Sequence, residues 1–283
     1  MSNIKNAKWL KENLNCENLI IVDCRFSLMD KNYGEEGYEK EHIKGAIRID
    51  IEKELSGQVL KHGGRHPLPK IRELQELFES KGIGNDSIVL VYDDGDLTGA
   101  SRLWWILKYL GHKDVYVLNG GINAFKKIGG ETSSEYPVKN RSIFNVNLQE
   151  TMKIEMEYVR ERLYRKNIII VDCREYGRYT GKYEPVDVKS GHIPNSKSYF
   201  WKDILNYNDS TYSIKSKKEL ELYYRRLKNY EEVIIYCGSG ITASVASLAL
   251  SEIGINHKFY AGSFSDWISY KDNEVCKIEY CVC

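Results

Sequence analysis

The sequence predicts an α/β protein built from two similar domains, each a parallel sheet with helices on both faces. Two observations carry this prediction. The chain has 283 residues, more than one compact domain usually holds. The run IIVDCR occurs at residues 20–25 and again, identically, at residues 169–174, and continuous β-branched runs of this kind are typical of buried parallel strands. The chain therefore contains an internal repeat.

The later elements of the two copies correspond in order. Further strands are expected at residues 88–92 and 233–236, and each is followed by a short polar turn and a helix, over 100–110 and 242–253. Each copy then closes with a strand and a glycine-bearing turn before an aromatic residue. Because strands alternate with helices and crossover connections are right-handed, each copy should form a parallel sheet covered on both faces.

The segment between the copies contains Pro137 with several Ser and Asn residues and no helical period, so an extended linker is expected there. We place the first domain at residues 1–138, the linker at 139–150 and the second domain at 151–283. The two copies differ at one informative position, because Asp93 stands where the second copy has Cys237. We therefore expect a catalytically inactive first domain and a catalytic second one.

The charge balance favours neither nucleic acid nor membrane as a partner. Lys and Arg number 41 against 40 Asp and Glu, so the net charge is +1. No stretch approaches a membrane span, and the N-terminal residues lack the apolar core of a secretion signal. Seven cysteines scattered through a long chain fit reduced thiols better than a disulfide framework. A cytoplasmic protein is expected.

Cys237 occupies a position where a thiol can become reactive. It follows a buried strand and opens the loop CGSGIT before a helix rich in small residues. The carboxyl ends of parallel strands are where ligands bind, and a loop entering a helix there points backbone N–H groups inward. Such groups and the helix dipole lower the pKa of a thiol. Cys24 and Cys173, within strand-like runs, are interpreted as small buried hydrophobic residues.

With these motifs the chain resembles the tandem-domain rhodaneses and 3-mercaptopyruvate sulfurtransferases. The resemblance covers nearly the whole chain. It rests on the Cys237 loop and on the motifs DCR at 172–174, GRY at 177–179, SGHIP at 190–194 and GSFSDW at 262–267. It implies two tandem rhodanese-like domains and a sulfurtransferase that carries sulfur as a persulfide on Cys237, in a cleft between the domains, with no metal and no organic cofactor.

The resemblance also bears on the sulfur donor. The thiosulfate-specific branch carries cations in its loop, whereas CGSGIT has no charge and is similar to the mercaptopyruvate branch. We therefore expect 3-mercaptopyruvate as the small-molecule donor, releasing pyruvate, with thiosulfate as the alternative. A small thiol, cyanide or thioredoxin is expected as the acceptor.

Proton transfer in the mercaptopyruvate branch resembles a serine-protease arrangement. The resemblance assigns the serine to Ser239 and the histidine to His66. Two acidic positions, Asp50 and Glu52, could support the histidine, and the choice between them stays open.

The resemblance makes Arg178 the residue that binds the anionic end of the donor, a task that suits a planar guanidinium. The loop residues Gly238, Gly240, Ile241 and Thr242 are expected to line the same site. Mercaptopyruvate enzymes often carry a second Arg between residues 181 and 191, and this chain has none there, so Lys182 or Lys189 is a candidate substitute. Arg174 is expected to order local structure by pairing with Asp172 or a loop carbonyl.

Two other classes of protein fit the sequence less well. Phosphatases of the same fold need an Arg six residues after the cysteine, and here that position is Ala243. A non-catalytic rhodanese-type binding module would lack the reactive thiol that Cys237 supplies. The C-terminal cysteines Cys276, Cys281 and Cys283 lack the spacing of a zinc site, and an exposed tail with incidental thiols is favoured over a redox role.

Overall fold

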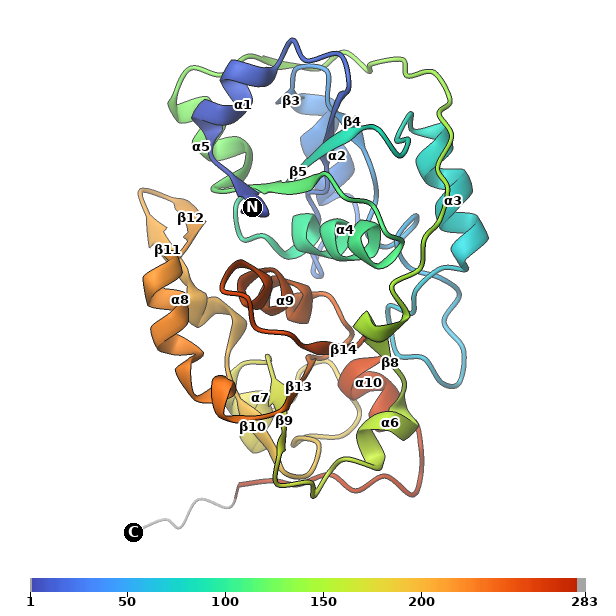
Figure 1. The fold of residues 1–283 in the computed structure, drawn as a ribbon, viewed down its shortest axis with the longest axis vertical. Helices are drawn as coiled ribbons and strands as arrows, with labels where there is room; N and C mark the ends of the chain where they lie inside the picture. Colours follow the sequence, from blue (N-terminus) through green and yellow to red (C-terminus); the bar gives the residue numbers. More distant parts are fainter. Residues whose placement is uncertain (1, 279–283) are drawn as a thin grey trace. The chain divides into compact units, whose positions relative to one another are not determined.

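The computed structural model describes residues 2–278, which form two compact units (Figure 1). Unit 1 contains the chain up to Gly57, then Leu68–Glu150 and Leu205–Lys215. Unit 2 contains Gln58–Pro67, Thr151–Ile204 and the chain from Ser216 onward. Each unit therefore includes one short segment from the opposite half of the sequence.

Unit 1 is built on a five-stranded parallel sheet with the strand order β1-β6-β5-β2-β4. Its strands are β1 (Ile4–Lys5), β2 (Leu19–Asp23), β4 (Ile47–Arg48), β5 (Ile88–Tyr92) and β6 (Val115–Leu118). The flanking helices are α1 (Ala7–Asn13), α2 (Tyr33–Lys40), α3 (Ile71–Ser80), α4 (Thr98–Tyr109) and α5 (Gly121–Lys127). Helices α1 and α5 lie side by side, and α4 packs on β5 and β6 (Figure 1).

Unit 2 repeats this plan, and its strand order from the corresponding edge is β8-β14-β13-β9-β10. Its strands are β8 (Lys153–Ile154), β9 (Ile168–Asp172), β10 (Ser196–Ser198), β13 (Glu232–Tyr236) and β14 (Lys258–Tyr260). The flanking helices are α6 (Met156–Arg160), α7 (Tyr176–Thr180), α8 (Lys217–Tyr223), α9 (Thr242–Glu252) and α10 (Ser263–Trp267). Both sheets are parallel throughout and place corresponding strands in the same order, so the predicted fold class is confirmed.

Short elements complete the two units. The strands β3 (His42–Ile43) and β7 (Thr132–Ser133) pair antiparallel in unit 1. The segment that unit 1 takes from the second half is the hairpin of β11 (Leu205–Asn208) and β12 (Thr211–Ile214). Single 3₁₀ turns are η1 (Glu150–Met152), η2 (Trp201–Ile204) and η3 (Arg225–Asn229).

The repeated apolar runs form the central strands because both faces of each sheet are covered. All five residues of β2 and the last four of β9 are buried. Both strands end one residue earlier than the apolar runs suggest, at Asp23 and Asp172, so Cys24 and Cys173 lie just beyond them and are fully buried. The interpretation of these two cysteines as buried small side chains agrees with this burial.

The Asp-x-Arg pair after each central strand has the same structural role in both units. Arg174 donates to the Asp172 carboxylate at 2.6 Å and to the Gly191 carbonyl oxygen at 2.6 Å. In unit 1, Arg25 makes the same pair of contacts, to Asp23 and to a loop carbonyl, each at 2.7 Å. Arg174 therefore orders local structure, as the sequence predicts.

Residues 58–67 pack as part of unit 2 through backbone contacts. The N–H of Gly63 donates to the Asp266 carboxylate at 2.7 Å, and the N–H of Arg65 donates to the Ser265 hydroxyl at 3.1 Å. A side chain at Gly64 would collide with the carbonyl oxygen of Gly262, so glycine is required for this close approach. The segment therefore brings its His and Arg side chains to the unit that contains Cys237.

Candidate active site

The Cys237 loop connects β13 to α9 and is held by its neighbours on both sides. The N–H of Phe264 donates to the Cys237 carbonyl oxygen at 3.0 Å, and the N–H of Ser265 to that of Gly238 at 2.9 Å. The Cys237 N–H in turn donates to the Ser263 hydroxyl at 3.1 Å. Gly240 has a φ of 84°, a left-handed conformation that favours glycine and lets the loop curl back over the thiol.

This curl surrounds the sulfur of Cys237 with hydrogen-bond donors. The N–H of Gly240 donates to Sγ at 3.1 Å. Burial raises the pKa of the thiol, but the Thr242 hydroxyl and the N–H groups of Ala243, Ser239 and Gly240 lower it by more, so the pKa of Cys237 lies below its ordinary value. The loop therefore stabilises a thiolate, as its position before a helix predicts.

The equivalent loop of unit 1 carries a carboxylate in place of the thiolate. Asp93 accepts the N–H groups of Gly95, Leu97 and Ala100 at 2.8, 3.2 and 3.0 Å. Burial and the nearby Asp96 raise the pKa of Asp93 to about 8, against the effect of the backbone donors. The loop geometry is thus kept in both copies, while unit 1 has an aspartate where unit 2 has Cys237.

Two of the predicted proton-transfer residues meet in unit 2. Nδ1 of His66 lies 2.7 Å from the hydroxyl oxygen of Ser239, and both side chains are buried. His62, four residues earlier, contacts a different serine, Ser269, at 2.7 Å and stacks on Tyr270. The structure therefore distinguishes the two histidines of this segment.

The two candidate acids lie in unit 1, just after β4. Asp50 forms an ion pair with Arg48 at 2.9 Å. Its other oxygen accepts the N–H groups of Glu52 and Lys53 at 2.9 and 3.0 Å. Both oxygens of Asp50 are therefore engaged in ordering their own turn.

Arg178, on α7, belongs to a cluster of charges beside the Cys237 loop. Its Nε donates to both oxygens of Glu184 at 3.0 Å, and its Nη2 donates to Asp187 at 2.9 Å. The side chains of these two acids are 3% and 2% exposed. The loop before residue 190, which lacks an arginine, instead supplies two buried carboxylates.

The second guanidinium of this cluster comes from Arg65, which the sequence interpretation did not single out. Arg65 donates through Nη1 to Asp187, the same acid that pairs with Arg178. A Cβ atom at Gly238 would lie 3.0 Å from Nη2 of Arg65 and 3.4 Å from Nη2 of Arg178. The only sequence signal was the position of Arg65 directly before His66. Lys182 and Lys189, the candidates named for this role, are exposed.

The remaining loop residues have distinct places. Thr242 and Gly240 hydrogen-bond to the sulfur of Cys237, and Gly238 lies beneath the two guanidinium groups. Ile241 is buried at the start of α9. These residues therefore surround the thiolate.

The C-terminal cysteines are only partly described. Cys276 pairs with His192 through two backbone hydrogen bonds, at 2.8 and 2.9 Å, whereas Cys281 and Cys283 lie outside the described residues. Within residues 2–278 no group of three or more His, Cys, Asp or Glu side chains could hold a metal ion.

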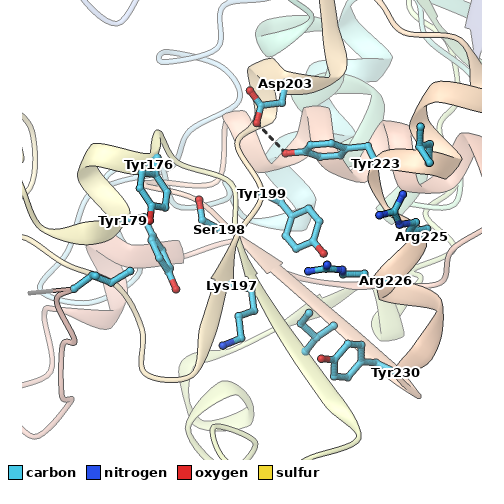
Figure 2. Close-up of a pocket in the computed structure, with 13 residues that line it drawn as sticks. Tyr176, Tyr179, Lys197, Ser198, Tyr199, Asp203, Tyr223, Arg225, Arg226 and Tyr230 are labelled. Atoms are coloured by element: carbon cyan, nitrogen blue, oxygen red, sulfur yellow. Dashed lines mark hydrogen bonds between the residues drawn. The ribbon is translucent and has the colours of Figure 1, made fainter. Parts of the chain in front are cut away.

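A hollow in unit 2 lies beside the edge strand β10. It has a volume of about 680 Å³, and its lining includes Lys197, Tyr199, Arg225, Arg226 and Tyr230 (Figure 2). The Tyr223 hydroxyl donates to Asp203 at its rim at 3.2 Å. None of the lining residues belongs to the Cys237 loop, so this hollow is separate from the thiolate site.

A duplicated α/β fold with a buried cysteine of lowered pKa at a helix start is typical of enzymes that use a cysteine nucleophile. Comparison with known proteins gives the family. The rhodanese-like domain model matches residues 6–128 and again residues 155–270. The chain belongs to the rhodanese family.

Its relatives are sulfurtransferases, and so is this chain. It is 34% identical over 266 residues to a Pseudomonas aeruginosa protein named "Probable 3-mercaptopyruvate sulfurtransferase", covering 93% of this chain and 94% of the relative. It is 30% identical over 274 residues to a mouse thiosulfate sulfurtransferase, covering 93% and 90%. Among solved structures, the 3-mercaptopyruvate sulfurtransferase SseA from Escherichia coli superposes with a TM-score of 0.82 at 26% identity, covering 94% of this chain and all of SseA.

Proposed function

We propose that this enzyme takes sulfur from 3-mercaptopyruvate, holds it as a persulfide on Cys237 and passes it to a thiol or cyanide acceptor. The observation that carries the proposal is the buried Cys237 sulfur within a ring of hydrogen-bond donors, which lowers the pKa of the thiol and so favours its nucleophilic thiolate form.

In the first step the Cys237 thiolate attacks the donor sulfur. A sulfur–sulfur bond forms, the carbon–sulfur bond of mercaptopyruvate breaks, and the bonding pair leaves on carbon as the enolate of pyruvate. The sulfur keeps its proton, so the enolate needs one proton from elsewhere to become pyruvate. With thiosulfate the leaving group is sulfite, which needs no proton at this step.

The contact between Ser239 and His66 supports a route for that proton. In this route the Ser239 hydroxyl protonates the enolate and recovers a proton through Nδ1 of His66, which acts as a general acid and base.

The donor carboxylate is proposed to bind at Arg178. The guanidinium lies beside Gly238, one residue from the nucleophile, and is held in place by two buried acids. The uncharged loop CGSGIT supports a donor with a single negative charge. Thiosulfate, a dianion, is the alternative donor for the same nucleophile. Relatives named for mercaptopyruvate and for thiosulfate support both donors as candidates.

A comparison of the two donors tests this proposal. With cyanide as the common acceptor, we expect kcat/KM for mercaptopyruvate to exceed that for thiosulfate by at least about tenfold, because donor specificity is a ratio of kcat/KM values. Thiocyanate formation measures both reactions. A higher kcat/KM for thiosulfate would contradict the donor assignment. No reaction with either donor would favour the alternative that the chain is a non-catalytic binding module.

Replacing Arg178 by Lys tests the binding of the donor carboxylate. Lysine keeps the charge, but its single ammonium group cannot bind two acidic side chains and the donor carboxylate at the same time as a planar guanidinium can. We therefore expect KM for mercaptopyruvate to rise about tenfold with little change in kcat. The same substitution at Arg162, which pairs with Glu161 and Glu232 outside this cluster, is the matched control. An unchanged KM in Arg178→Lys would remove Arg178 from donor binding.

The acceptor and the compartment belong to the proposal as well. The outer sulfur of a persulfide can pass to cyanide, a small thiol or a protein dithiol such as thioredoxin. Five cysteines of the described part of the chain are free thiols, which supports a reducing compartment, and we propose the cytoplasm. Within residues 2–278 no helix is long and apolar enough to span a membrane.

A further inference from the structure

We propose that Asp187, by bridging Arg65 and Arg178, sets the net charge of the donor site and thereby selects a donor with one negative charge over a dianion. The inference rests on the proposed function and names the residues that determine specificity at that site. Asp187 is bound by both guanidinium groups, one on each carboxylate oxygen. Removing its charge should therefore change the cluster's balance more than its shape.

The charges of the cluster cancel. Arg65 and Arg178 face Asp187 and Glu184. A further ion pair, that of Arg174 and Asp172, reaches the cluster, with Arg174 3.3 Å from Glu184. Three guanidinium cations thus meet three carboxylates, and those carboxylate side chains are at most 3% exposed. The site has strong donors of hydrogen bonds but no surplus positive charge.

Each of the two outer arginines keeps one nitrogen for a ligand. Arg65 uses Nη1 for Asp187, while Nη2 faces Gly238 at 3.0 Å from the place of a Cβ atom. Arg178 uses Nε and Nη2 for the acids, while Nη1 lies 3.6 Å from the same place. The N–H groups of the two guanidinium groups therefore lie near the same place above Gly238, where they can bind one carboxylate. Arg65 thus supplies the second guanidinium that the loop at 182–190 lacks.

The absence of surplus positive charge in the cluster disfavours a donor with two negative charges. At neutral pH mercaptopyruvate brings one negative charge beside the Cys237 thiolate, whereas thiosulfate brings two. Like charges at short range repel strongly when solvent is largely excluded. The lowering of the Arg65 pKa by burial and by Arg178 agrees with two cations held close together in a site of limited solvent access. A neutral cluster leaves the second charge of thiosulfate uncompensated.

Replacing Asp187 by Asn tests the inference because it leaves one net positive charge above the loop. We expect the ratio of kcat/KM for thiosulfate to that for mercaptopyruvate to rise by about tenfold, the size expected for one added charge at close range with partial solvent screening. Thiocyanate formation with cyanide reports both donors. The matched control is Asp272→Asn, the same change at an exposed position of unit 2, and its ratio should equal that of the wild type.

A second variant keeps the test decisive if Asp187→Asn fails to fold. Arg65→Gln alters a side chain that is 32% exposed and removes one cation, so it should shift the ratio the opposite way, against thiosulfate. A purely structural role would lower kcat/KM for both donors equally and leave the ratio unchanged, and that result in either variant that folds would overturn the inference. A wild type inactive with both donors would instead overturn the proposed function.

Discussion

Replacing Cys237 by Ser is expected to lower kcat for sulfur transfer from either donor by a factor on the order of 10³ or more. A serine hydroxyl fits the same loop but stays protonated at neutral pH and forms no persulfide. The hydrogen-bond donors that lower the pKa of Cys237 favour its thiolate form, the form that attacks sulfur. Thiocyanate formation from cyanide measures the loss.

The matched control for this variant is Cys276→Ser. Cys276 also lies in unit 2, but it pairs with His192 through backbone hydrogen bonds, which a serine keeps, so activity should stay near that of the wild type. Unit 1 cannot compensate for the loss, since Asp93 fills the corresponding loop. Substantial activity in Cys237→Ser would mean that another thiol carries the sulfur.

Replacing His66 by Ala is expected to slow pyruvate release from mercaptopyruvate about 100-fold, the usual contribution of a general acid and base. The enolate then lacks the proton that Ser239 would deliver. Loading from thiosulfate should be nearly unaffected, because sulfite leaves without a proton. Single-turnover kinetics with each donor separate the two effects.

His62→Ala provides the matched control, because it removes the same ring from the same segment but breaks a contact with Ser269 instead of Ser239. His62→Ala should leave the single-turnover rates with both donors unchanged. Equal slowing of both donors in His66→Ala would indicate that the histidine only holds residues 58–67 in place. An unchanged rate with mercaptopyruvate would remove His66 from the mechanism.

The fold could be predicted from the sequence because its signals are local and occur twice. The IIVDCR runs became β2 and β9, and the strand orders of the two sheets correspond. The expected helix over 100–110 begins earlier, at Thr98, because the polar turn of unit 1 already has helical geometry there. The position of Cys237 between a buried strand and a helix likewise follows from chain order alone.

The donor site was only partly predictable, because its charges come from segments far apart in the chain. Arg65 precedes Asp187 by more than a hundred residues, and only the folding of residues 58–67 against residues 262–266 brings them together. Charged residues in a polar loop resemble ordinary surface residues until their burial is known. Glu184 and Asp187 therefore gave no signal, and Arg65 gave only its position directly before His66.

The most direct test of the central claim is the intact mass of the reduced protein after exposure to mercaptopyruvate. Cys237 should gain one sulfur atom, the Cys237→Ser variant should gain none, and thiosulfate should load the wild type more slowly. Equal loading of the wild type and the Cys237→Ser variant would contradict Cys237 as the sulfur carrier.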